Sequence, residues 1–197
     1  MNANLSTRRQ QSIVALLVAA AVFTAIAIFD LIAHPADQGA LRTSTEYVLT
    51  ATLIPAPLIV MWVLAALERL HTGYESRLGR VGLRIAAAGL AALVIDGVAT
   101  LAGGSTDVAG PLYPIGMLAT LAGIVLVAIH WYRARMLPRW AGPTLALGWF
   151  LGATPILGSG AAFLILAAAF LAIAVGLHRQ MPTRGTAAIS LDSSIAA

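Results

Sequence analysis

The sequence predicts an all-α integral membrane bundle from three observations: its composition, six long apolar segments and the placement of its arginines. Of the 197 residues, 59% are hydrophobic and only 10% are charged, whereas a soluble domain is about 25% charged. This composition excludes an ordinary soluble domain and an intrinsically disordered chain. The chain has no cysteine, which excludes disulfides, thiolate metal sites and thiol catalysis.

Six apolar segments predict six transmembrane helices. A helix needs about 20 apolar residues to cross the ~30 Å hydrocarbon core of a bilayer. The stretch from residue 141 to 177 has no charged residue and is too long for one span, and Pro155 with the glycines that follow it divides the stretch in two. The predicted spans are residues 12–33, 46–67, 81–102, 111–129, 141–157 and 159–177. They form one predicted domain, residues 1–180, followed by a flexible cytoplasmic tail at 181–197.

Each predicted span has its own local signals. Span 12–33 is longer than the apolar region of a cleaved signal peptide, which is about 7–15 residues, so we expect it to be retained. Span 46–67 contains Pro55 and Pro57, which free backbone carbonyls and predict a helix break in mid-membrane. That break either shapes the bundle or acts as a gate beside a cavity. Span 111–129 is followed by His130 and an aromatic and basic group that is typical of a membrane interface.

The arginines predict the orientation of these spans. Arginine supplies all twelve basic side chains, and all but Arg42 lie on one side of the predicted membrane. These are Arg8, Arg9, Arg69, Arg77, Arg80, Arg84, Arg133, Arg135, Arg139, Arg179 and Arg184. The positive-inside rule places that side, and both termini, in the cytoplasm. The net charge of +4 therefore indicates orientation and membrane lipids as partners, and not nucleic acid.

Small residues at helical spacing predict which helix faces pack closely, because helices in lipid associate where their backbones can approach. Three spans carry such faces: Gly89, Ala92, Asp96, Thr100 and Gly103 on the third; Gly116, Thr120, Gly123, Val127 and His130 on the fourth; Gly148 and Gly152 on the fifth.

Four titratable residues in the outer third of the predicted membrane form a candidate polar pocket: Asp96, Asp30, Glu46 and His34. An ionised aspartate at a helix centre costs about 2.5–3.5 kcal/mol, so we expect Asp96 to face the bundle interior. In a structural interpretation Asp96 bonds Thr100 or another helix, Glu46 caps its helix and Asp30 pairs with Arg42. In a functional interpretation the carboxylates line an outward-opening pocket that transfers protons or binds a cation or polar ligand.

The sequence contains no motif for a named chemistry. No two histidines share a helix at metal-ligand spacing, and the GxSxG, HExxH, Walker and GxGxxG motifs are absent. We therefore predict no metal site and no cofactor, and the catalytic residues of any enzyme activity stay unknown.

The segment 133–142, Arg-Ala-Arg-Met-Leu-Pro-Arg-Trp-Ala-Gly, lies between the fourth and fifth spans. It resembles a turn between two late helices in small multi-pass membrane proteins of high-GC, actinobacterial-type bacteria. The resemblance extends over residues 110–177. It implies a six-helix protein of the bacterial inner membrane whose specific role is uncharacterised, and it transfers no catalytic residue.

Three functional hypotheses follow. The leading one is a non-enzymatic accessory or interaction component, whose partner is a second copy of the chain or another membrane protein. The second is a small proton- or cation-coupled transporter, with Asp96 as the carboxylate and Pro55 and Pro57 as the gate. The third is an intramembrane enzyme on a lipid or isoprenoid substrate, with Asp30 and Asp96 as acid and base.

Overall fold

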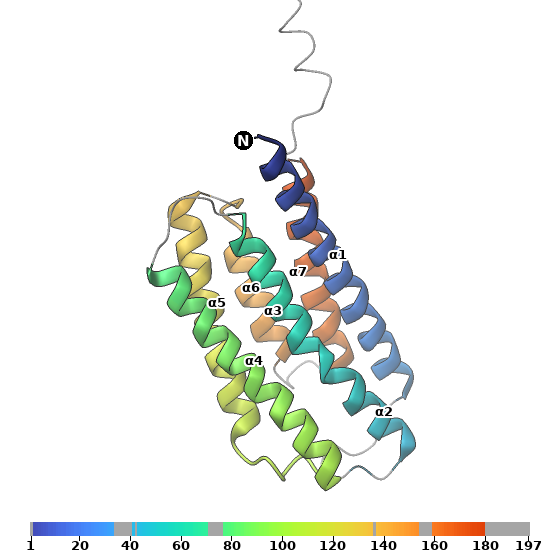
Figure 1. The fold of residues 1–197 in the computed structure, drawn as a ribbon. Helices are drawn as coiled ribbons and strands as arrows, with labels where there is room; N and C mark the ends of the chain where they lie inside the picture. Colours follow the sequence, from blue (N-terminus) through green and yellow to red (C-terminus); the bar gives the residue numbers. More distant parts are fainter. Residues whose placement is uncertain are drawn as a thin grey trace, which may run out of the picture.

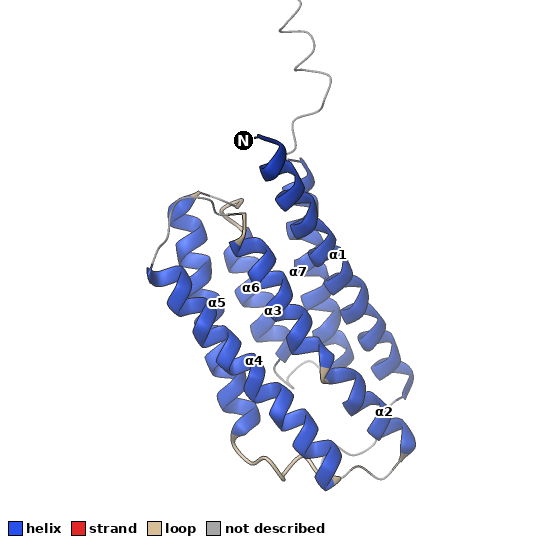
Figure 2. Cartoon of the chain, in the orientation of Figure 1, coloured by secondary structure: helices blue, strands red, loops and turns tan. Residues whose placement is uncertain are grey.

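The structure, a computed structural model, describes residues 2–33, 41, 43–70, 77–135, 137–153 and 159–179. In these ranges the chain consists of helices and short connections, packed as one bundle (Figures 1 and 2). The helices are α1 (Asn2–Ala33), α2 (Ser44–Leu53), α3 (Pro55–Glu68), α4 (Arg77–Gly103), α5 (Leu112–Ala134), α6 (Ala141–Ala153) and α7 (Ser159–Arg179).

Five helical segments are long and apolar enough to cross a membrane: Ser6–Ile32, Ser44–Glu68, Arg77–Gly103, Leu112–Ala134 and Gly160–Arg179. The predicted helical membrane bundle is confirmed at this level. The described part of the fifth predicted span, α6, has 13 residues and rises about 20 Å, less than the ~30 Å hydrocarbon core. Residues 154–157 of that span and the predicted tail at 181–197 lie outside the part of the chain that the structure describes.

The second predicted span is two helices, because α2 ends at Leu53 and α3 begins at Pro55. Pro55 and Pro57 have no N–H, so the carbonyls of Ala51 and Leu53 lose their usual donors. Ile54, between the two helices, keeps helical dihedral angles of φ −61° and ψ −44°. The break therefore interrupts the hydrogen bonds of the helix while the backbone stays helical in its angles.

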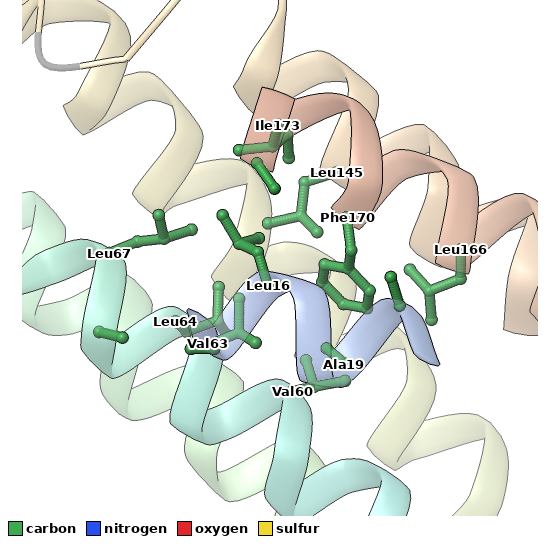
Figure 3. Packing of buried hydrophobic residues seen from close by; sticks show 14 of the residues in the cluster. Leu16, Ala19, Val60, Val63, Leu64, Leu67, Leu145, Leu166, Phe170 and Ile173 are labelled. Atoms are coloured by element: carbon green, nitrogen blue, oxygen red, sulfur yellow. The ribbon is translucent and has the colours of Figure 1, made fainter. Parts of the chain in front are cut away.

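Leu16, Val63, Leu145 and Phe170 are fully buried in the part of the apolar core between α1, α3, α6 and α7 (Figure 3), and the core continues onto α4 and α5. The ring of Phe23 lies 5.7 Å from that of Phe170, measured between centroids. In Figure 1 the first and last helices of the bundle, α1 and α7, lie side by side. Because lipid is as apolar as these side chains, the core is stabilised by close van der Waals packing more than by removal of apolar surface from water.

Helices α4 and α5 approach each other backbone to backbone. A Cβ added at Gly123 would lie within 2.6 Å of Ala86 N and of Gly82 O on α4, and one at Gly89 would lie 2.5 Å from Thr120 N on α5. The face predicted on the fourth span, from Gly116 to His130, is buried as expected.

The face predicted on the third span is buried at Gly89 and Thr100 and only partly covered at its other positions. The buried small residues of α4 are Gly79, Gly82, Ala86, Gly89 and Thr100, whereas Ala92 and Asp96 are half-buried and Gly103 is exposed. The close contact ends after Gly89 because the next residue on that face is Leu93, whose side chain occupies the space beside Gly116. The face predicted on the fifth span, with Gly148 and Gly152, packs inside the molecule, where Gly152 lies against Ala162 of α7.

Helices α2, α3 and α4 are packed more tightly at one end of the bundle than at the other. Helix α3 buries seven of its 14 residues, whereas α2 buries two of its 10. In α4, five of the six buried residues precede position 91. Tight packing is therefore concentrated where α3 ends and α4 begins.

Substituting Gly123 tests the contact between α4 and α5. We expect Gly123→Ala to lower the free energy of unfolding by about 2 kcal/mol, because the new methyl group meets backbone atoms that no rotamer change can move. This loss exceeds the ~0.5–1 kcal/mol that alanine gains over glycine in a helix. Thermal unfolding in detergent, followed by circular dichroism, measures it.

Gly97→Ala is the matched control, because its Cβ meets only the Ile54 side chain, at 3.0 Å. We expect it to change stability by less than about 0.5 kcal/mol. Equal losses for the two variants would contradict the backbone contact.

Candidate functional site

The described arginines lie at one end of the bundle, where α1, α4 and α6 begin and α3, α5 and α7 end (Figure 1). They are Arg8, Arg9, Arg69, Arg77, Arg80, Arg84, Arg133, Arg135, Arg139 and Arg179. Arg8 Nη1 donates a hydrogen bond of 3.2 Å to the Arg69 carbonyl at the end of α3. The guanidinium of Arg139 stands over the Tyr132 ring at 5.9 Å. We call this the arginine-rich end.

At the opposite end, Glu46 completes a capping box at the start of α2. Its Oε2 accepts a 2.9 Å hydrogen bond from Thr43 N, and Thr43 Oγ1 accepts one of 3.3 Å from Glu46 N. These bonds satisfy backbone donors that the first turn of a helix leaves without partners. The Glu46 carboxylate thus has a structural role at the helix terminus.

Asp30 is also buried, with 7% of its surface exposed. It lies beside the start of α7, since a Cβ added at Gly160 would come within 3.1 Å of Asp30 Oδ2. Glycine at position 160 leaves room for this carboxylate between α1 and α7.

Asp96 lies elsewhere, on the loosely packed half of α4. It is half-buried, its Oδ1 is shielded from the surface, and this atom accepts no hydrogen bond from the described residues. The phenol of Tyr113 on α5 is within electrostatic range of the carboxylate. The next residue, Gly97, lies against Ile54, so Asp96 is close to the break between α2 and α3.

Each described candidate residue has a different neighbour. Asp30 lies beside α7, Glu46 caps α2 and Asp96 lies near Tyr113, while His34 and Arg42 fall outside the described ranges. Among the residues with described positions, no three His, Asp or Glu side chains come close enough to hold a metal ion.

A polar cluster that sequence reasoning missed lies at the arginine-rich end. Glu68, the last residue of α3, accepts a 3.1 Å hydrogen bond from Trp131 Nε1 on α5. Its other oxygen lies 3.6 Å from His130 Nε2, within ion-pair distance when the imidazole is protonated. His130 and Trp131 are each 1% exposed, and Gly79 of α4 leaves the space in which His130 and Glu68 meet.

This Glu68 cluster joins α3 to α5 across the start of α4. The predicted face that runs from Gly116 to His130 indicated a buried histidine, because His130 lies on the same helix face as Gly116 and Gly123. Glu68 itself gave no such signal, since an acid at a helix end is usually solvated.

Comparison of the chain with protein-family models, with curated proteins and with solved structures found no match.

Trp131→Phe tests the bond between α3 and α5. Hydrogen bonds to charged groups contribute about 1.5–3 kcal/mol and neutral ones about 0.5–1.5 kcal/mol. Trp149→Phe is the matched control, because Trp149 is also buried and donates a longer 3.4 Å bond to the neutral Met117 carbonyl. We expect Trp131→Phe to lower the free energy of unfolding by about 1 kcal/mol more than the control.

The same comparison made in Glu68→Gln protein gives a specific readout. There the excess loss from Trp131→Phe should shrink, because the charged acceptor is gone. An excess of the same size would show that the indole contributes packing alone.

Proposed function

We propose that the chain is a six-span protein of the bacterial inner membrane, with both termini in the cytoplasm, and that it acts as a non-enzymatic accessory or interaction component. The dispersal of the described acidic side chains is the observation that carries this proposal. Glu46 caps α2, Glu68 binds the Trp131 indole, and Asp30 and Asp96 lie beside different helices. An acid–base pair formed by Asp30 and Asp96 therefore has no support from this arrangement.

The outer surface supports the membrane setting. Large apolar side chains point away from the bundle on several helices, including Ile32, Ile95 and Leu118, which are 76%, 59% and 66% exposed. Exposing such side chains to water costs free energy, whereas exposing them to lipid does not. The proposed partner, another membrane protein or a second copy, would meet this apolar surface or the arginine-rich end.

Two observations support six passes in the proposed orientation. Helix α6 starts beside Ala128 near the end of α5 and finishes beside Ala162 near the start of α7. It thus runs away from the arginine-rich end, and α7 returns to it. Arginines at one end of a bundle are typical of the cytoplasmic side. The resemblance of segment 133–142 to proteins of high-GC bacteria agrees with this proposal.

Single cysteines map this topology, because the chain has none of its own. An impermeant maleimide added to cells with a permeable outer membrane should label Thr106→Cys and Thr154→Cys. It should label Ser6→Cys only after the inner membrane is disrupted. If Thr154→Cys behaved like Ser6→Cys, α6 would not cross the membrane. If Thr106→Cys were protected and Ser6→Cys labelled, the orientation would be reversed.

The transporter alternative depends on Asp96, whose buried Oδ1 beside a helix break is its one favourable feature. For an interaction component we expect wild-type protein in vesicles to give the same proton flux as Asp96→Asn protein, measured with an enclosed pH dye. Asp107→Asn is the control, because Asp107 is an exposed loop carboxylate. A wild-type flux that Asp96→Asn lowers tenfold or more, and that Asp107→Asn keeps, would replace the leading proposal with a transporter.

A further inference from the structure

A shallow groove of about 420 Å³ runs along the outward face of α7. Ala168, Ala172 and Gly176 are four residues apart and therefore lie in a row on one helix face, and Ala168 and Ala172 form the open floor of the groove. Trp140 and Arg179 border the groove at the arginine-rich end.

Trp140, which precedes α6, forms the wall at that end. Its ring covers the backbone of Gly176, where an added Cβ would lie 2.7 Å from the ring atom Cζ2. The side chain is still 43% exposed. Tryptophan is enriched where hydrocarbon meets headgroups, so its position marks the membrane interface beside Arg179.

The length of the groove matches one leaflet of a bilayer. Ala168 and Arg179 are eleven residues apart, which corresponds to about 16 Å along the helix. One leaflet of the hydrocarbon core is about 15 Å deep, half of the ~30 Å total. An acyl chain that starts at Arg179 would therefore lie along the whole groove.

Charge decides which headgroup suits this end. Arg139 is held over Tyr132, so the guanidinium that borders the groove is that of Arg179. The carbonyls at the end of α7 carry about half a negative charge, which the full charge of Arg179 exceeds. A phosphate with a net negative headgroup matches this local charge better than a zwitterionic one.

We propose that this groove binds an anionic phospholipid, with its phosphate at Arg179 and one acyl chain that passes the Trp140 ring and lies along Ala172 and Ala168. The inference rests on the proposed insertion of the chain in a membrane. A second copy fits the groove less well, because close packing of two helices along small residues needs the whole row free. Here the Trp140 ring already covers Gly176.

Native mass spectrometry of the full chain in mild detergent, with phosphatidylglycerol or phosphatidylcholine added, tests the proposal. We expect the wild-type protein to retain phosphatidylglycerol preferentially, and Arg179→Gln to lower its occupancy about fivefold. Arg133→Gln, which removes an exposed arginine of α5 from the same end, should leave occupancy unchanged.

A second pair of variants tests the floor of the groove. Ala172→Phe fills the groove at an exposed position and should lower phosphatidylglycerol occupancy without loss of folding, whereas Ala122→Phe, at an exposed position of α5, should not. Equal retention of both lipids, or equal loss in Arg179→Gln and Arg133→Gln, would overturn the proposal. So would a dimer that Ala172→Phe converts to monomers, because the groove would then belong to a second copy.

Carbonate extraction of cell membranes separates this inference from the proposed function. Protein that stays in the membrane pellet but shows no preference for phosphatidylglycerol contradicts the lipid site alone. Protein released by carbonate contradicts membrane insertion, and the lipid site with it.

Discussion

The backbone contact between α4 and α5 determines the arrangement of the neighbouring helix ends. In lipid, helices gain little from hiding apolar surface, so the closeness of their approach decides how strongly they pack. Gly82, Gly89 and Gly123 allow that approach. The same register places Gly79 beside His130, so that Glu68 at the end of α3 reaches α5 and closes the arginine-rich end around a buried polar cluster.

The contact does not extend to the other end of the molecule. Leu93 takes the place of a small residue, and beyond it Thr100 alone among the residues of α4 is buried. Helix α2, separated from α3 by the proline break, buries little of its surface there. The chain thus combines an arginine-rich end with tight packing and a looser region around Asp96. The groove on α7 belongs to the first end, where charge and interface residues coincide.

Local signals in the sequence were sufficient for the helices, the site of the proline break and the packing faces of α5 and α6. These features depend on residues within one segment: an apolar run, a missing N–H, glycines at helical spacing. The end of the close contact between α4 and α5 after Gly89 and the Glu68 cluster depend on which helices become neighbours and how each is rotated, which one sequence does not specify. For the same reason the similar depth of Asp30, Glu46 and Asp96 does not specify their neighbours, which lie in different parts of the bundle.

Hydrogen–deuterium exchange of the protein in lipid nanodiscs tests the difference between the two ends most directly. Amides in closely packed helices exchange only when the helices open. Slow exchange is therefore expected at residues 82–89 of α4 and 116–123 of α5, with clearly faster exchange at residues 47–53 of α2. Equally slow exchange in all three segments, or faster exchange in α4 and α5 than in α2, would contradict the claim that the bundle is packed most tightly between α4 and α5.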